Sequence, residues 1–347
     1  MGFRVVCSAT VICSALSGAA FAESPRLTMS EAMIPSSDPG IKLYIRNKRP
    51  EGVTSFSPDK TLLFIHGATY PAETSFDLPI DGVSMMDRFA QSGFDVYLVD
   101  VRSYGRSTRP PQMDQAPEAN KPIATSEEAG ADLGAAVDYV LAQRGISKLD
   151  LMGWSWGTSI AGAYTANHND KINRLVLYAP AWISQPPVEP STNAIPAYRL
   201  VAKDSAKARW LQGVPEDKKA DLIPPGVFDR WWDATLATDP VGSKMDPPRL
   251  RAASGVTYEF TNYWGAGKPF YDPGQITVPT LLIHAEWDAD LPTYMAEAYF
   301  AKLTSTPYKR FVQLGEGTHT VMLEKNRLQF FHEILGFLDE SGATALK

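Results

Sequence analysis

The stretch KLDLMGWSWGTSIAGAYT at residues 148–165 decides the fold of this chain. Its first five residues form a run of strand length, and its last eight are mostly small, as a closely packed helix requires. Between them, the pattern G-x-S-x-G is typical of a tight turn that lifts Ser155 above the edge of a sheet. We expect Cβ atoms at Gly153 and Gly157 to collide with the neighbouring strand and helix, so glycine is needed at both positions.

Apolar runs of strand length alternate with segments of helical spacing along the rest of the chain. The expected strands are Thr61 to Ile65, Phe94 to Val99, Leu149 to Met152, Arg174 to Tyr178, Thr280 to Ile283 and Tyr308 to Leu314, with Ile41 to Arg46 as an N-terminal edge strand. The expected helices are Val83 to Gln91, Ser126 to Gln143, Thr158 to His168, Thr293 to Leu303 and Arg327 to Leu338. This alternation predicts an α/β fold with a mostly parallel central sheet flanked by helices.

Residues 181–275 interrupt the alternation, and they hold twelve of the 27 prolines and five of the eight tryptophans. An insertion of this length, with so many large aromatic side chains, favours a helical cap or lid that follows the sixth strand and packs over the strand ends. The alternative is a proline-rich surface excursion with no role in the site. We therefore expect a core formed by residues 23–180 and 276–347, with a cap at 181–275.

The first 22 residues have the pattern of a signal peptide. Arg4 gives the positive start, Val5 to Leu16 the short apolar region, and Ala20 to Ala22 an A-x-A cleavage site. We expect export to the periplasm or the medium after cleavage near Ala22. Cys7 and Cys13, the two cysteines of the chain, both lie in this leader, so we expect no disulfide or thiolate metal site afterwards.

Composition narrows the function classes. The chain is 44% hydrophobic and 21% charged, with a formal net charge of -6 and no run of Lys and Arg, so we expect no nucleic-acid partner. No later apolar run reaches the ~20 residues of a transmembrane segment. Neither an H-E-x-x-H motif nor a phosphate-binding G-x-x-x-x-G-K-[ST] loop occurs, and we expect neither a metal nor a cofactor.

A serine hydroxyl is a poor nucleophile at neutral pH, so Ser155 needs a base. Four of the five histidines fall within or at the ends of the expected strands and helices. His319 lies instead in the Gly-rich loop at residues 315–320, after the last expected strand, from which an imidazole can reach Ser155. His319 is therefore the expected base.

The carboxylate that orients the base is expected just after a strand that lies, in the sequence, between Ser155 and His319. The segment HAEWDADLP at residues 284–292 follows such a strand and offers three carboxylates. Asp288 falls in the turn beyond the strand end, and we expect it to be the orienting acid. We expect Glu286 to lie within the strand. Asp290, better placed to cap the next helix, stays the alternative.

The order of Ser155, Asp288 and His319 resembles that of nucleophile, acid and base in the α/β-hydrolase superfamily, and the chain looks like a serine carboxylesterase of that family. The turn DVRSYGRS at residues 100–107 resembles the family's D-x-R-G-x-G-x-S turn, with Ser103 where glycine is usual. We interpret this turn as structural. The resemblance covers nearly all of the chain outside the insertion and implies an acyl-enzyme mechanism.

The segment HGAT at residues 66–69 resembles the family's HG-x loop. The resemblance implies that the backbone amides of Ala68 and Trp156 form an oxyanion hole, with no cofactor. Aromatic residues suited to an apolar or aromatic small-molecule ester surround this site in the sequence; they are Trp154, Tyr70, Trp287 and Trp182. The alternative for each is that it packs the insertion against the core. Hydrolysis of a carboxylic ester is the expected function.

Other functions on the same fold remain open. A proline iminopeptidase usually shows G-G-S-W-G and HGGPG, whereas this chain has Trp154 in place of the middle Gly and Ala68-Thr69 in place of Gly-Pro. Such a peptidase also needs acidic cap residues for the substrate amine. The candidates for that role are Glu189, Asp204, Glu216, Asp229 and Asp233. Thioesterases, lactonases, carbon-carbon bond hydrolases and perhydrolases use the same triad. An inactive binding protein on this fold generally lacks one part of the site, whereas every part is present here.

Overall fold

The computed structural model describes residues 1–2, 25–189 and 193–340. Nearly all of the expected signal peptide, residues 3–22, lies outside the described part. The central sheet has eight strands in the order β1-β2-β4-β3-β5-β6-β9-β10. Their bounds are β1 Leu27–Pro35, β2 Lys42–Pro50, β3 Thr61–Ile65, β4 Asp95–Val99, β5 Leu149–Trp154, β6 Ile172–Tyr178, β9 Thr280–Ala285 and β10 Lys309–Leu314.

The sheet is mostly parallel, as the sequence predicted. Within this sheet β4, β3, β5, β6, β9 and β10 pair in parallel with one another, whereas β2 pairs antiparallel with both β1 and β4. Every residue of β3, β4, β5 and β9 is buried, which explains their nearly continuous apolar sequences. Parallel strands bring their carboxyl ends to one edge, where the elbow and the acid-bearing turn both begin.

One prediction about the sheet was wrong. The segment Ile41 to Arg46, expected at the edge, belongs to β2 and is second in the sheet, because β1 pairs with its outer side. β1 has the sequence LTMSEAMIP, and only Ile34 in it is buried. A strand that is so exposed and so rich in polar residues gives no periodic signal.

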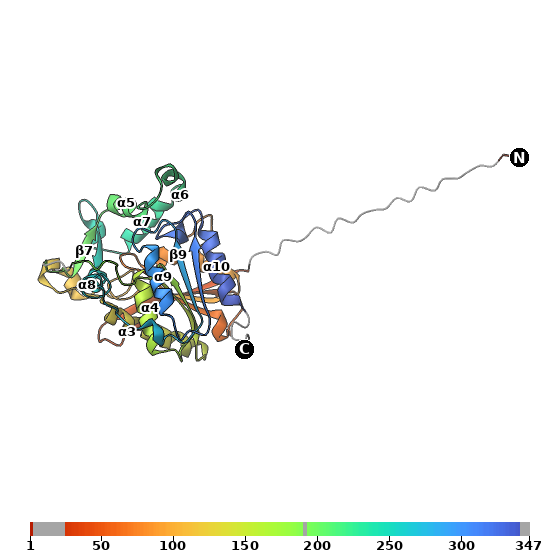
Figure 1. The fold of residues 1–347 in the computed structure, drawn as a ribbon, viewed down its shortest axis with the longest axis horizontal. Coiled ribbons are helices and arrows are strands. Elements are labelled where there is room, and N and C mark those ends of the chain that lie inside the picture. Colours follow the sequence, from red (N-terminus) through yellow and green to blue (C-terminus); the bar gives the residue numbers. More distant parts are fainter. Residues whose placement is uncertain (3–24, 190–192, 341–347) are drawn as a thin grey trace.

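The helices lie on both sides of the sheet (Figure 1). They are α1 Ala72–Phe76, α2 Met85–Gln91, α3 Ser126–Arg144, α4 Trp156–Asn167, α9 Thr293–Lys302 and α10 Arg327–Asp339. Local signals set their ends. Thr125 and Glu128 form a capping box at the start of α3, and Gly145 ends that helix in the left-handed conformation with φ 63°. None of the helices among the described residues is both long and apolar enough to cross a bilayer.

Among its described residues, the insertion between β6 and β9 contains four α-helices and a two-stranded sheet whose strands are far apart in sequence. They are β7 Tyr198–Val201, α5 Lys203–Trp210, α6 Lys219–Leu222, α7 Val227–Ala237, β8 Leu250–Ala253 and α8 Gly255–Asn262, and α5, α6 and α7 lie together at one end of the molecule (Figure 1). β7 and β8 pair antiparallel, so the insertion is not purely helical. The ring of Trp231 packs on Tyr70 of the core with centroids 4.6 Å apart, and Thr235 Oγ1 donates to Thr74 Oγ1 at 2.9 Å.

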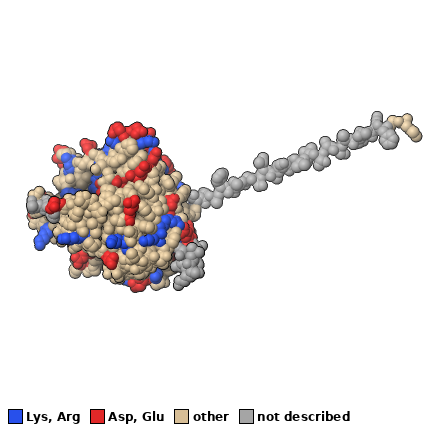
Figure 2. All heavy atoms as spheres, viewed as in Figure 1, with Lys and Arg blue, Asp and Glu red and all other residues tan. Residues whose placement is uncertain are grey.

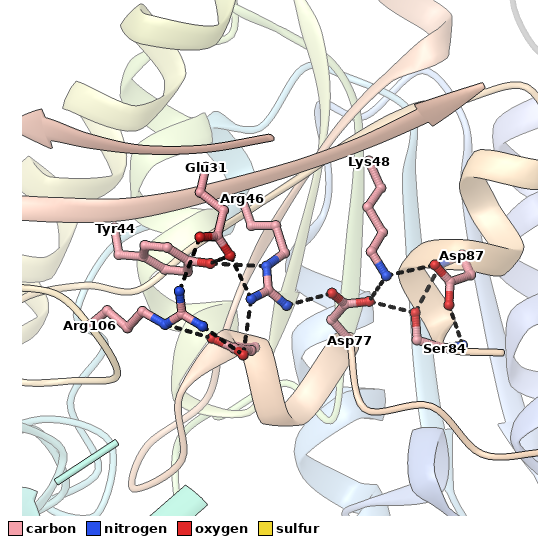
Figure 3. A network of polar contacts seen from close by, with 9 residues as sticks. Glu31, Tyr44, Arg46, Lys48, Asp77, Ser84, Asp87 and Arg106 are labelled. Atoms are coloured by element: carbon pink, nitrogen blue, oxygen red, sulfur yellow. Dashed lines mark hydrogen bonds and ion pairs between the residues drawn. The ribbon is translucent and has the colours of Figure 1, made fainter. Parts of the chain in front are cut away.

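A buried polar network ties β2 to the segment that follows the HGAT loop (Figure 3). Arg46 of β2 pairs with Asp77 at 2.7 Å, and Lys48 contacts both Asp77 and Asp87 at 2.6 Å. Ser84 donates to Asp77 at 2.6 Å, which joins the start of α2 to the same carboxylate. Buried charges with several partners fix geometry, so the network holds α1 and α2 in place.

The turn at residues 100–107 is braced in a similar way. The carboxylate of Asp100 accepts from the backbone amides of Ala72 at 2.8 Å and Arg106 at 3.2 Å, while Arg102 pairs with Asp132 at 2.7 Å. The structural interpretation of this turn is confirmed by these contacts.

On the face that Figure 2 shows, acidic and basic side chains are intermingled.

Candidate active site

Ser155 lies in a strained turn between β5 and α4. Its backbone has φ 56° and ψ −125°, a conformation that side-chain-bearing residues rarely adopt. A Cβ at Gly153 would lie 2.4 Å from the carbonyl oxygen of Gly157, and one at Gly157 would lie 2.5 Å from that of His66. The predicted collisions with the adjoining helix and strand end are therefore confirmed. The two glycines allow the turn to present Ser155 at the edge of the sheet.

The structure brings His319 into contact with Asp288. The ring nitrogen Nδ1 of His319 lies 2.7 Å from Oδ2 of Asp288, in the turn after β9. The second oxygen, Oδ1, accepts from the backbone amides of Asp290 and Leu291, both at 3.0 Å. The Asp288 side chain is inaccessible to solvent, so these three donors fix its carboxylate. Because Nδ1 is engaged, Nε2 is the ring nitrogen left for proton transfer.

Each partner shifts the pKa of the other. Burial raises the pKa of Asp288, but the adjacent His319 and the Leu291 amide outweigh burial and hold that pKa below its ordinary value. Burial also lowers the pKa of His319, yet the carboxylates of Asp288 and Asp290 leave it raised above 6.5. Thus Asp288 stays ionised at neutral pH and strengthens His319 as a proton acceptor.

Three neighbours hold the loop that carries His319. The indole Nε1 of Trp154 donates to the His319 carbonyl at 2.9 Å, and the Tyr178 hydroxyl donates to the Thr318 carbonyl at 2.5 Å. Glu324 accepts from the Thr318 amide at 2.9 Å and also from its hydroxyl. Burial raises the pKa of Glu324 to about 7. Sequence reasoning missed Glu324, because nothing local marks it out in the segment after the loop.

The HGAT loop lies directly against Ser155. A Cβ at Gly67 would come within 2.9 Å of the Ser155 Cβ, so only glycine fits there. His66 Nε2 accepts from the Val101 amide at 3.2 Å, and its Nδ1 lies 2.6 Å from the Gly67 carbonyl. Burial lowers the pKa of His66 to about 4, so this imidazole is neutral. Its two contacts brace the loop. Ala68 follows at the wall of the same cavity as Ser155.

Two adjoining cavities open beside Ser155. The smaller, of about 20 Å³, has room for one or two waters. The larger has about 220 Å³. Both cavities are lined by Ala68, Ser155, Arg209 and Asp290. The small cavity is lined in addition by His319, Tyr70, Trp154, Ala206, Trp210, Trp231 and Thr320. The larger cavity is lined in addition by Trp156, Ala181, Arg199, Val256, Thr257, Phe260, Trp264 and Leu291. Ser155 thus lies between an aromatic pocket and a mixed polar one.

The aromatic residues expected to bind substrate divide into two groups. Trp154 and Tyr70 line the small cavity. Trp182 instead packs edge-on against Tyr271 and Tyr299, with ring centroids 6.1 and 5.2 Å apart. Neither Trp182 nor Trp287 lines the two cavities as the structure describes them. Sequence proximity to the acid or to the start of the insertion does not say which way a side chain faces.

Trp156 carries a further contact that the sequence did not indicate. Its indole Nε1 donates to Ser126 Oγ at 2.8 Å, and the Ser126 amide donates to Glu259 of α8 at 3.0 Å. The residue after Ser155 is thereby joined to the insertion through the start of α3.

Sequence reasoning also missed Arg199 and Arg209, since chain order does not say which residues of a long insertion turn toward a site.

Residues 60–326 match the family model described as alpha/beta hydrolase fold. The chain belongs to this family. Its structure is similar to that of an esterase from Exiguobacterium antarcticum, at 19% identity and a TM-score of 0.57 over 90% of this chain and 100% of the esterase. A serine hydrolase involved in carbazole degradation matches at 15% identity and a TM-score of 0.59, covering 90% of this chain and 99% of that one.

Est816, described as an N-acyl homoserine lactone degrading enzyme, matches at 16% identity and a TM-score of 0.59, over 88% of this chain and all of its own. No curated protein matches the sequence. Likeness at these identities shows the α/β-hydrolase fold alone, because one fold hosts many chemistries. The function must therefore be argued from the site itself.

This α/β-hydrolase has a larger hollow elsewhere. A surface hollow of about 650 Å³ lies between α3 and α4, and its lining includes none of Ser155, Asp288 and His319. Within the described residues, His, Cys, Asp and Glu side chains nowhere gather in a group of three that could hold a metal ion.

Proposed function

We propose that this hydrolase cleaves carboxylic esters through an acyl-enzyme on Ser155. The observation that carries the proposal is the 2.7 Å contact between His319 Nδ1 and Asp288 Oδ2, in a site where Ser155 and His319 line one cavity. A strained serine, an oriented imidazole and a buried carboxylate are the parts that acyl transfer requires. The esterase and the serine hydrolase of similar fold agree with this chemistry.

The mechanism follows from the placement of these groups. His319 takes the hydroxyl proton through Nε2 as Ser155 Oγ attacks the carbonyl carbon, while Asp288 holds the ring in the tautomer that leaves Nε2 free. The backbone amides of Ala68 and Trp156 stabilise the oxyanion, each by about 3–4 kcal/mol. His319 then protonates the departing alcohol. A water molecule, deprotonated by His319, attacks the acyl carbon and releases the acid and Ser155.

The small cavity suggests which part of the ester binds there. Tyr70, Trp154 and Trp231 give it apolar walls, and its volume of about 20 Å³ admits only a small group unless these walls move. We propose a small-molecule ester whose apolar end faces this cavity. The partner is thus a small molecule, and no nucleic acid enters the proposal.

The charges at the site count against the iminopeptidase alternative. The charged side chains that line the larger cavity are Arg199, Arg209 and Asp290, and Asp290 is already paired with Arg209 at 2.9 Å. None of the five acidic residues considered for binding an amine lines either cavity. Asp229 and Asp233, for example, have side chains 68% and 73% exposed to solvent. A cationic substrate would face two guanidinium groups.

Export completes the proposal and rests on sequence alone. The charged start, the apolar stretch and the A-x-A site ending at Ala22 support cleavage near that residue. N-terminal sequencing of the protein recovered from the periplasm or medium tests this point. An intact N-terminus in the cytoplasm would refute it.

Labelling by a fluorophosphonate tests the proposed function. The wild-type protein should be labelled on Ser155, and Ser155→Ala should abolish the label. Ser159→Ala, which changes a buried serine one turn further along α4, is the matched control and should retain it. An unlabelled wild-type protein would instead indicate the inactive binding scaffold. Turnover of proline p-nitroanilide faster than of p-nitrophenyl acetate would replace the esterase by the peptidase.

A further inference from the structure

The larger cavity beside Ser155 carries an unbalanced positive charge. Of its three charged side chains, Arg209 and Asp290 neutralise each other, because Arg209 Nε contacts both carboxylate oxygens at 2.9 Å. Arg199 is the third, and it forms no ion pair with any carboxylate in residues 25–189 and 193–340. Its guanidinium donates only to neutral acceptors, the hydroxyl of Thr69 and the carbonyl of Ala253 at 3.0 Å.

An unpaired guanidinium in a partly buried site is costly to maintain. An arginine keeps its charge in proteins, and removal of that charge from water costs free energy unless an anion offsets it. Burial accordingly lowers the pKa of Arg199, the opposite of what a carboxylate partner would do. The contacts within the protein leave this charge uncompensated. An anion bound in the cavity would supply the missing partner.

Arg199 is close to the reacting groups. Its hydrogen-bond partner Thr69 immediately follows Ala68, the expected oxyanion donor, and both Arg199 and Ser155 line the larger cavity. Trp264 lines the same cavity. The indole nitrogen of Trp264 is buried and has no hydrogen-bond acceptor among the described residues.

We propose that the ester substrate carries a carboxylate, which Arg199 binds in the larger cavity while the scissile carbonyl lies at Ser155. This inference rests on the proposed ester hydrolysis and names its substrate class. A guanidinium presents paired N–H donors that match a carboxylate. The cavity volume of about 220 Å³ is below the roughly 300–1,000 Å³ of common small-molecule pockets, so the acid is small. The apolar part of the substrate faces the small cavity.

Two pairs of esters test the proposal on either side of the scissile bond. Monoethyl adipate and its amide analogue, with CONH₂ in place of the carboxylate, place the charge on the acyl side. 3-Acetoxybenzoate and 3-acetoxybenzamide place it on the alcohol side. Acid release is measured by pH-stat titration at one pH for each ester. The wild-type enzyme should prefer the carboxylate in at least one pair by about tenfold or more in kcat/KM.

Substitutions then assign that preference to Arg199. Arg199→Gln should lower the ratio of kcat/KM for charged over neutral ester by about 10- to 100-fold, and Arg199→Lys should retain part of it. The control is Arg230→Gln, an equal charge change on α7 at an exposed position outside both cavities, which should leave the ratio unchanged. Thermal unfolding of both Arg199 variants separates a binding effect from a folding defect.

The outcomes distinguish the two proposals. A wild-type enzyme that cleaves the neutral ester of each pair as fast as the charged one retains ester hydrolysis but overturns the carboxylate assignment. Arg199→Gln slowing both members of a pair equally also overturns it, since Arg199 would then only brace Thr69. Labelling by fluorophosphonate without cleavage of either charged ester overturns it as well. If the protein is neither labelled nor active, ester hydrolysis itself is wrong and the inference falls with it.

Discussion

The indole nitrogen of Trp154 donates a 2.9 Å hydrogen bond to the backbone carbonyl of His319, and the two rings lie 5.5 Å apart. The residue that precedes the nucleophile therefore positions the base. Trp154→Phe keeps an aromatic ring but removes the donor, so kcat should fall about tenfold. The acid limb of the pH profile should also move toward 6.5 as the His319–Asp288 contact loosens.

Steady-state kinetics separate this positioning role from a role in the cavity wall. A rise in KM alone would show that Trp154 only contacts substrate, and an unchanged kcat would contradict the prediction. Trp232→Phe is the matched control, because Trp232 is equally buried on α7 and lines neither cavity.

Asp288→Asn should reduce kcat by about 10⁴-fold while leaving the protein folded. The Asn carbonyl oxygen can still accept from the Asp290 and Leu291 amides, but its NH₂ group then faces His319 Nδ1. The imidazole is driven to the tautomer with its proton on Nε2, where it cannot accept the Ser155 proton. Asp290→Asn removes a carboxylate that pairs with Arg209, and kcat should change less than tenfold. The reverse ranking would make Asp290 the orienting acid.

Chain order and turn chemistry made much of the fold and site predictable. The six core strands of the expected parallel sheet all occur, and the elbow glycines are needed for the reason given from sequence. Asp288 and His319 follow β9 and β10, which are neighbours in the sheet, so their contact follows from the parallel topology. Short-range patterns suffice where a residue is placed by the end of a strand.

Other features depend on long-range packing that periodicity does not record. Arg199 and Arg209 reach the site because the insertion folds back over it, and no local motif states where an inserted segment lies. Glu324 acts through a buried contact with Thr318. In the sequence it looks like any other acidic residue. Trp182 lies among other aromatic rings. Burial in any apolar environment is favourable for such a side chain, so its sequence position does not say which one it occupies.

The pH dependence of kcat/KM on a neutral ester should show an acid limb above 6.5. Despite burial, Asp288 holds the pKa of His319 above that value, and only the neutral imidazole accepts the Ser155 proton, so activity rises with pH across the limb. Asp290 also raises this pKa and Arg209 lowers it. Asp290→Asn should therefore move the limb to lower pH and Arg209→Gln to higher pH. Shifts in the same direction would refute this account.

The same titration affects stability. Because the folded-state pKa of His319 is raised, its protonated form stabilises the fold fully below pH 6.5, and this contribution disappears as the pH rises through the folded-state value. The difference in unfolding free energy between wild type and His319→Gln should accordingly shrink from pH 6 to pH 9. Urea titrations at several pH values measure it, and a difference that grows with pH would contradict the sign.

Substitution of the elbow glycines should disrupt folding. Gly157→Ala places a methyl group 2.5 Å from the His66 carbonyl oxygen and 2.8 Å from that of Ile65, and backbone atoms there cannot move aside. We expect the unfolding free energy to fall by several kcal/mol, roughly as for other overpacked cores. Gly130→Ala is the control. Gly130 lies inside α3, and a Cβ added there meets no atom within 4 Å. Because alanine has the higher helix propensity, the unfolding free energy should rise by about 0.5–1 kcal/mol. Equal effects would refute the steric argument.

The buried contact between Trp210 and Glu324 connects the insertion to the loop that carries His319. Trp210 Nε1 donates to Glu324 Oε1 at 2.8 Å, and Glu324 Oε2 accepts from the Thr318 amide. Trp210→Phe keeps most of the buried ring but leaves the carboxylate one donor short, so the unfolding free energy should fall by about 2 kcal/mol. The acid limb of kcat/KM should shift toward 6.5, because His319 is then held less firmly against Asp288. A loss of substrate contact in the small cavity would raise KM without moving that limb. Trp232→Phe removes an indole nitrogen of a similarly buried ring that has no contact with Glu324, and its pH profile should match that of the wild type.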